Sequence, residues 1–235
     1  MAPPDRSALR STSAHVLVEA ELLGVAGAIG LDDATEHHLR KVLRLRDGEA
    51  VGITDGNGRW RLGVAVVEAN RLRLDATSET VAEPMPTRPI VVAAALPKGD
   101  RLDWMVQKVT ELGIDRLVLL HADRSVARWK PDRVDHQLAR LQRIADEALR
   151  QSRRVRRLTI EPPRPAADVL TGFVIAEPGG RSLTVADTSV AVGPEGGWSD
   201  AELAVAGERI DLGPTILRTE TAALAISALC VAFER

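Results

Sequence analysis

The stretch DLGPTILRTETAA, residues 211–223, indicates the fold and the site of this chain when it is taken together with VGPEGGW, residues 192–198. In each stretch a short strand ends in a Gly-Pro turn and a helix follows. Backbone N–H and C=O groups lack partners at such strand ends, and glycine lets a ligand approach them closely. Neither turn continues into Gly-Lys-Ser/Thr, the sequence of a triphosphate-binding loop. The two turns therefore predict a site for a small molecule other than a nucleoside triphosphate.

The chain around these turns has the pattern of an α/β protein. From Ile90 onward strands and helices alternate, which predicts a parallel sheet covered by helices. Gly113 is expected to end the first of these helices, and Ser199 with Glu202 to form a capping box on a later one. The expected strands are 90–96, 116–122, 158–160, 173–176, 190–193 and 209–213, and the expected longer helices are about 101–112, 131–151 and 221–233.

The preceding part of the chain is mostly β-rich and predicts a small barrel. Residues 15–79 hold alternating apolar strands, with a hairpin turn at 55–58. One helix is expected among them, capped by Asp32 or Asp33 and ended by Asp47-Gly48. Its buried stripe is expected to consist of Leu39, Val42 and Leu43.

A proline-rich segment separates these two patterns. EPMPTRP, residues 83–89, carries three prolines in seven residues and is typical of a stiff linker. The sequence therefore predicts one domain over 1–82, a linker over 83–89 and a second domain over 90–235.

Composition excludes several classes of protein. The net charge of −2 argues against a protein that coats nucleic acid indiscriminately, although arginines cluster at 40–46 and 150–157. No apolar run is long enough to span a bilayer and no signal peptide is recognisable, so we expect a cytoplasmic protein. The single cysteine, Cys230, excludes an internal disulfide, and the histidines lack metal-ligand spacing. No metal is expected.

Three further motifs, taken together with the two Gly-Pro turns, resemble the sequence pattern of one protein family. They are HHLRKVLRLRDGE at 37–49, ALPKGDRLDWMVQKVTELG at 95–113 and RQSRR at 150–154. In this order they make the chain similar to the 16S ribosomal RNA uridine-N3 methyltransferases (RsmE-like), which belong to the trefoil-knotted SPOUT methyltransferases. Thr215 departs from the family pattern, because many members carry a basic residue there.

The resemblance implies a C-terminal trefoil knot on the parallel sheet, a PUA-like RNA-binding barrel and a homodimer. It also implies that S-adenosyl-L-methionine binds at the two Gly-Pro turns and that the partner is 16S ribosomal RNA, in the assembled small subunit. The residues that it assigns to the cofactor are Ala176, Glu177, Gly193, Pro194, Glu195, Gly196, Gly197, Leu212, Gly213, Ile216, Leu217 and Arg218.

Methylation of N3 requires loss of a proton, because uridine N3 is a poor nucleophile until then. Two residues are candidates for this chemistry. Arg218 is the cation that would stabilise the uridine anion, and Glu220 is the proton acceptor. Each residue also has a structural alternative to its catalytic role. Glu220 could be an acid in the first turn of the helix, and Arg218 could be the partner in a structural ion pair. The residues expected to contact RNA are His38, Arg40, Arg44, Arg46, Lys98, Arg153 and Arg154.

Two other functions compete with this hypothesis. Ribose 2'-O methylation is known among other knotted methyltransferases, and an RNA-binding assembly factor could keep the fold without turnover. The intact glycine turns and the RTET segment argue against the second of these.

Overall fold

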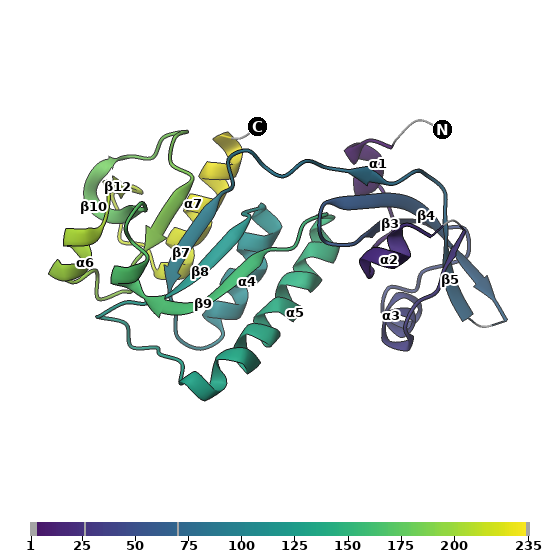
Figure 1. Ribbon diagram of the computed structural model, residues 1–235, viewed down its shortest axis with the longest axis horizontal. Coiled ribbons are helices and arrows are strands. Elements are labelled where there is room, and N and C mark those ends of the chain that lie inside the picture. The colour runs from purple at the N-terminus through teal and green to yellow at the C-terminus, as the bar shows by residue number, and fades with distance from the viewer. Residues whose placement is uncertain (1–3, 26, 70, 234–235) are drawn as a thin grey trace. The chain divides into compact units, whose positions relative to one another are not determined.

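The computed structural model describes residues 4–25, 27–69 and 71–233 of the chain, so the start of the predicted 1–82 domain and the end of the predicted 90–235 domain lie outside the described residues. The chain divides into two compact units (Figure 1). The first unit comprises residues 1–85 and 149–157, and the second comprises 86–148 and 158–235. The short segment 149–157 contains the last residues of the long helix α5 (Val134–Ser152). It belongs to the same unit as the N-terminal residues.

The first unit contains a mixed sheet in the order β1-β3-β4-β5-β2, with β6 paired to β4. The predicted hairpin is confirmed: β3 and β4 are antiparallel, and Asp55 accepts a hydrogen bond from the Asn57 N–H at 2.7 Å in the turn. The strands are β1 (Ala14–Leu17), β2 (Ala28–Ile29), β3 (Ala50–Thr54), β4 (Arg59–Glu68), β5 (Arg71–Ala76) and β6 (Val81–Ala82).

The helical segment of this unit differs in part from the prediction. Helix α3 (Asp33–His37) has the predicted cap, since Asp32 accepts from the Thr35 N–H. The chain then forms a π-helical turn, η1 (His38–Val42), in which the Leu43 N–H donates to the His38 carbonyl. The expected stripe was wrong beyond Leu39, because the wider turn changes the helical period and leaves Val42 62% and Leu43 48% exposed.

Two short helices of the first unit were not predicted, α1 (Arg6–Arg10) and α2 (Ala20–Leu23). Leu9 of α1 packs with Trp60 and with Val155 of the segment 149–157. The same segment is fixed by main-chain bonds, because the Val155 carbonyl accepts from Gly58 and the Arg157 N–H donates to Gly56. The segment is thus part of the core of this unit.

The second unit has the predicted parallel sheet. All neighbouring strands in the order β12-β10-β11-β7-β8-β9 pair in parallel. Both faces of such a sheet must be covered, and its central strand β7 is accordingly buried along its whole length. The strands are β7 (Val91–Ala95), β8 (Arg116–His121), β9 (Thr159–Pro165), β10 (Val174–Ser182), β11 (Ser189–Val192) and β12 (Arg209–Asp211).

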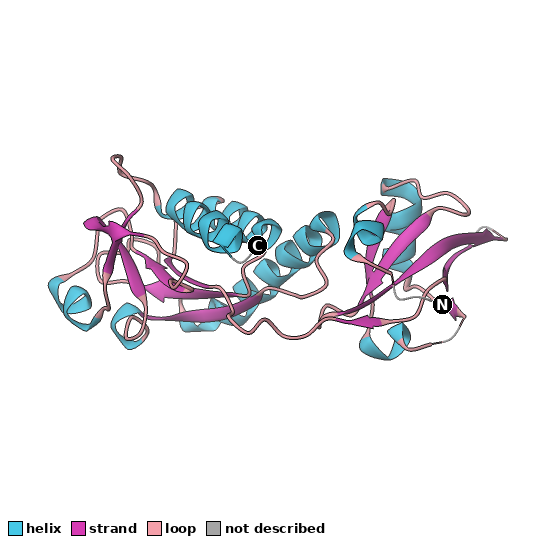
Figure 2. Cartoon of the chain, turned by 90° about the horizontal axis from the view of Figure 1, so that it is seen from above, coloured by secondary structure: helices cyan, strands magenta, loops and turns pink. Residues whose placement is uncertain are grey.

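Helices cover this sheet on both sides (Figure 2). One face packs against α4 (Arg101–Leu112), α5 (Val134–Ser152) and α7 (Thr219–Phe233), while the other packs against the short η3 (Ala166–Asp168) and α6 (Asp200–Val205). A single turn, η2 (Pro131–Arg133), precedes α5. The predicted caps are confirmed: Gly113 ends α4 with φ of 107°, and Ser199 and Glu202 form the capping box of α6.

Candidate functional site

Three neighbouring strands of the second unit bring the two Gly-Pro turns together. In the register of the sheet, Ala176 of β10 pairs with Val192 of β11 on one side and Ile210 of β12 on the other. Because the strands are parallel, their carboxyl ends meet at one edge, which is where α/β proteins bind ligands. Beyond Ala176, β10 shifts register, and this irregularity places residues 177–180 beside the turns.

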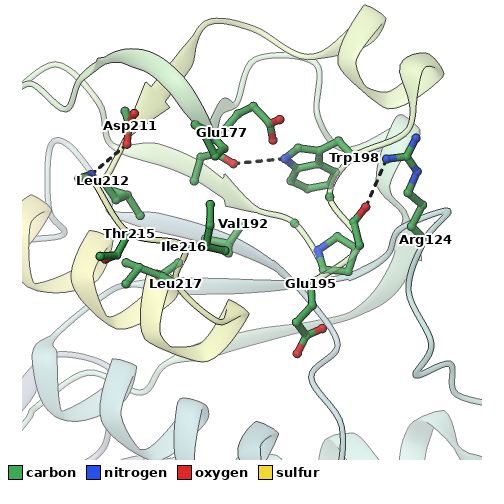
Figure 3. A pocket seen from close by; sticks show the side chains of 18 of the residues that line it. Arg124, Glu177, Val192, Glu195, Trp198, Asp211, Leu212, Thr215, Ile216 and Leu217 are labelled. Atoms are coloured by element: carbon green, nitrogen blue, oxygen red, sulfur yellow. Dashed lines mark hydrogen bonds between the residues drawn. The ribbon is translucent and has the colours of Figure 1, made fainter.

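A cavity of about 540 Å³ lies between these segments, within the size range of ligand pockets (Figure 3). Every residue predicted to bind cofactor lines it except Arg218. Further lining residues, which the sequence analysis did not assign to the cofactor, lie at the ends of strands at this edge, in the loops that follow them or at the start of α7. They are Arg124, Pro178, Val192, Trp198, Asp211, Pro214, Ala222 and Thr215, whose departure from the family pattern had been noted.

Glycine is required in the turns for two different reasons. A Cβ atom at Gly193 would lie 2.9 Å from the buried ring of Trp198, so the close neighbour at this position is a side chain of the protein. Gly213 has open space around it but a φ of 127°, which other residues rarely adopt. Asp211 supports that turn, because its carboxylate accepts from the N–H groups of Gly179 and Gly213, and these bonds lower its pKa.

The first turn is held from three sides. The Gly197 N–H donates to the Pro194 carbonyl at 2.8 Å, and Arg124 donates to the Gly196 carbonyl at 3.2 Å. The hydroxyl of Thr219, at the start of α7, donates to the Gly193 carbonyl at 2.9 Å. Three hydrogen bonds within the protein therefore fix the position of this turn.

The two predicted catalytic residues lie at the start of α7 with different environments. The Glu220 side chain is only 7% exposed, and one of its oxygens, Oε2, is buried with no hydrogen-bond partner among the described residues. Its other oxygen, Oε1, lies 3.7 Å from Nε of Arg101, a residue that the sequence analysis did not single out. Arg218 is exposed and forms no ion pair within residues 4–25, 27–69 and 71–233.

The residues predicted to contact RNA are distributed over both units. In the first unit His38, Arg44 and Arg46 are exposed around η1, whereas Arg40 is half-buried against Glu36 at 3.4 Å. Lys98 is exposed after β7 of the second unit.

Arg153 is used differently. Its guanidinium donates to the carbonyls of Thr12 at 2.8 Å and Arg150 at 2.9 Å, and burial lowers its pKa. Arg154 donates from Nε to the Arg156 carbonyl at 3.1 Å. These bonds attach both residues to the backbone of the first unit.

Within the described part of the chain, no group of three or more His, Cys, Asp or Glu side chains could hold a metal ion, and no helix could cross a membrane.

Comparison with known proteins agrees with this geometry. Residues 83–231 match the model of an RNA methyltransferase domain, and residues 31–75 match that of an RNA methyltransferase PUA domain. Ribosomal RNA small subunit methyltransferase E of Mycobacterium tuberculosis is 34% identical, covering 94% of this chain and 93% of that protein.

The chain belongs to this methyltransferase E family.

Other members of the family and solved structures extend the similarity. The Bacillus subtilis methyltransferase E is 30% identical over 82% of this chain and 86% of its own length. The Neisseria gonorrhoeae enzyme, solved bound to S-adenosyl methionine, superposes with a TM-score of 0.75 at 25% identity, covering 92% of this chain and 94% of that chain. A Legionella pneumophila methyltransferase at 22% identity has the same fold, with a TM-score of 0.76 and coverage of 93% and 96%. The family resemblance drawn from the sequence is confirmed.

Proposed function

We propose that the chain binds S-adenosyl-L-methionine in the cavity of the second unit and methylates N3 of a uridine in 16S ribosomal RNA. The observation that carries the proposal is the cavity itself, which both Gly-Pro turns line. The family name of the relatives and the S-adenosyl methionine bound in the Neisseria gonorrhoeae enzyme support it.

The lining residues suit this cofactor. Val192, Leu212 and Leu217 offer apolar surface for the faces of adenine, and the turns offer main-chain donors and acceptors for its edge. The carboxylate of Glu177 would accept from ribose hydroxyls. The cofactor supplies a methyl group already activated by a positively charged sulfur, so the reaction needs no metal.

The chain's own residues then have two tasks at the acceptor base. Glu220 takes the N3 proton, and its buried, unpartnered Oε2 is the oxygen available for it. Arg218, exposed and without an ion-pair partner in the described part of the chain, stabilises the negative charge that remains. The electron pair of N3 forms the new N–C bond, and the pair of the broken carbon–sulfur bond stays on sulfur.

RNA contacts complete the proposal. The exposed His38, Arg44, Arg46 and Lys98 would bind phosphates, and Arg40 would do so beside its partner Glu36. For Arg153 and Arg154 the bonds to backbone carbonyls favour a structural role.

We further propose the finer features of the family for this chain: a trefoil knot among the loops of the second unit, a closed barrel in the first, and a homodimer. The parallel sheet with its crossed strand order is compatible with the knot. Trp104 of α4, together with Leu229 and Phe233 of α7, exposes apolar surface that a second subunit would cover. The substrate would be the assembled small subunit, in the cytoplasm.

The test is to incubate the protein with methyl-labelled cofactor and small subunits that lack the modification, and then to identify the labelled nucleoside by mass analysis. We expect 3-methyluridine at one position of the 16S RNA. Label on a ribose 2'-oxygen would instead indicate ribose 2'-O methylation, the reaction of other knotted methyltransferases. Binding of RNA without any transfer would indicate an assembly factor.

A further inference from the structure

The buried carboxylate of Glu220 carries one oxygen that the protein leaves without a donor. Glu220 is the second residue of α7, and its Oε2 is buried without a hydrogen bond from any residue that the structure describes. Buried polar groups are nearly always hydrogen-bonded, so an unpartnered one calls for a partner from outside the described protein atoms, and a bound substrate is one such partner. Oε2 is therefore an acceptor without a donor among the described residues.

The other oxygen of this carboxylate is beside Arg101, the first residue of α4. Nε of Arg101 lies 3.7 Å from Glu220 Oε1, and Nη1 lies 3.4 Å from Oε1 of Glu195, which lines the cavity. The Arg101 side chain is 41% exposed. A guanidinium has five N–H donors, so these two contacts leave several of them for a further acceptor.

The contacts of Arg101 are longer than most other ion pairs in the same unit, apart from the 3.7 Å pair of the neighbouring residues Asp132 and Arg133. Arg116 pairs with Glu161 at 3.1 Å, and Lys108 with Glu111 at 2.8 Å. Thr219 already fastens the start of α7 to the first turn through the Gly193 carbonyl. The position of Arg101 between two carboxylates is thus not explained by a need to hold α7 and the turn together.

An acceptor and a donor side by side match one edge of uracil. The imide of uracil presents its N3–H donor between two carbonyl acceptors, and loss of the N3 proton spreads negative charge onto those two oxygens. A fixed cation at one of them stabilises the anion where its charge develops. Cytosine offers the reverse pattern, because its N3 is an acceptor and the neighbouring N4 is a donor.

We propose that Arg101 is a further catalytic residue, whose guanidinium donates to a carbonyl oxygen next to N3 of the acceptor uridine while Glu220 Oε2 accepts the N3 proton. The inference rests on the proposed function. It assigns to Arg101 a direct contact with the reacting base, and it makes the pair Arg101 and Glu220 responsible for preferring uracil over cytosine.

The experiment measures single-turnover methylation of small subunits by Arg101→Gln and Arg101→Lys, with cofactor affinity measured by calorimetry. Arg116→Gln is the matched control, an arginine of the same unit, similarly exposed and paired with a glutamate, at the amino end of β8. We expect Arg101→Gln to lower the rate at neutral pH by about a hundredfold, with cofactor affinity within about threefold of the wild type. The rate should recover as the pH rises and uridine ionises unaided, and Arg101→Lys should retain part of it.

Two results would overturn the assignment while the wild type still methylates N3. One is an Arg101→Gln rate equal to that of Arg116→Gln. The other is an equal loss of rate and cofactor affinity, reproduced by Glu195→Gln, which would make Arg101 a support of the cofactor turn. A wild-type protein that does not methylate N3 would overturn the proposed function, and this inference with it.

Discussion

Arginine is used in opposite ways beside the starts of α4 and α7 in the second unit and in the segment 149–157 of the first. Arg218, just before α7, is exposed without an ion pair to any described residue, and Arg101, the first residue of α4, makes only long contacts. In the segment, Arg153 donates to the Thr12 and Arg150 carbonyls, and Arg156 donates to the Asn57 carbonyl at 2.8 Å. Guanidinium donors without a protein acceptor are available to a ligand, whereas donors bound to carbonyls hold the fold, as Arg124 also does at the Gly196 carbonyl. Substitutions at the cavity and beside these helix starts should therefore change binding and rate, and those in the segment should change stability.

The largest effect is expected at the first Gly-Pro turn. A Cβ at Gly196 would lie 3.2 Å from Cβ of Arg124, so the branched side chain in Gly196→Val forces the turn away from its present position. Calorimetry should show cofactor affinity reduced by more than about a hundredfold, with an unchanged circular dichroism spectrum. Gly30→Val is the control, since Gly30 has open space and an ordinary φ. Unchanged affinity in Gly196→Val would remove the turn from the site.

The next effect concerns the start of α7. Arg218→Ala should lower turnover by about a hundredfold with little loss of cofactor affinity, as expected for a lost donor at a developing anion. Glu220→Gln should lower turnover similarly at pH 7 and recover as the pH rises, because a base is then no longer needed. If Glu220 is only a helix acid, its variant will show a lower melting temperature and near-normal turnover in the folded fraction.

Substitutions in the segment 149–157 are expected to change the stability of the protein rather than its turnover. Arg153→Met removes the bonds to Thr12 and Arg150 and should lower the free energy of unfolding by about 2 to 3 kcal/mol, the size expected for bonds from a charged donor. Arg46→Met in the same unit should change it by less than about 0.5 kcal/mol, because Arg46 is exposed. Denaturant unfolding measures both. A stable Arg153→Met protein with a lost methylation rate would contradict the comparison.

His15 adds a pH dependence to the same segment. It donates from Nε2 to the Arg154 carbonyl at 2.7 Å, and burial, reinforced by the charges of Arg153, Arg6 and Arg150, lowers its pKa from 6.5 to about 4. Below pH 6.5 the unfolded chain binds a proton that the folded chain does not, so this contribution to stability falls as the pH drops. From pH 7 to 5 the loss should be about 2 kcal/mol. His15→Gln should lose this component, and His136→Gln, at an exposed position, should keep it.

The smallest effect is expected in the salt dependence of RNA affinity, which should differ between the arginine clusters at 40–46 and 150–157. Each lost phosphate contact should make the log-log slope of affinity against salt shallower by roughly 0.7 to 0.9. We expect that change for Arg44→Gln and for Arg46→Gln, and none for Arg153→Gln in its folded fraction. Equal changes in all three would show that Arg153 contacts phosphate in addition to its backbone bonds.

Much of the second unit could be predicted because its signals are local. Strand, Gly-Pro turn and capping box each depend on a few neighbouring residues, and parallel pairing then brings the turns together. The ion pair of Arg101 with Glu220 could not be predicted, since it joins residues far apart in the chain. The π-helical turn at His38–Val42 also escaped, because Val42 and Leu43 fit an ordinary helical period. Arginine composition likewise gives no sign of whether a guanidinium will meet phosphate or a carbonyl.

The division of the first unit into two pieces of chain has a consequence for biosynthesis. Its small core joins Leu9 and Trp60 to Val155, so the first unit cannot be completed until Val155 has emerged from the ribosome. By then β7 and β8 of the second unit have already been made. The fragment 1–85 lacks residues 149–157 and is therefore an incomplete first unit, whereas 86–235 contains the whole second unit. Expressed separately, the fragment 1–85 should not fold into an independent protein. A genetic fusion that carries residues 149–157 behind the N-terminal fragment would restore the missing piece.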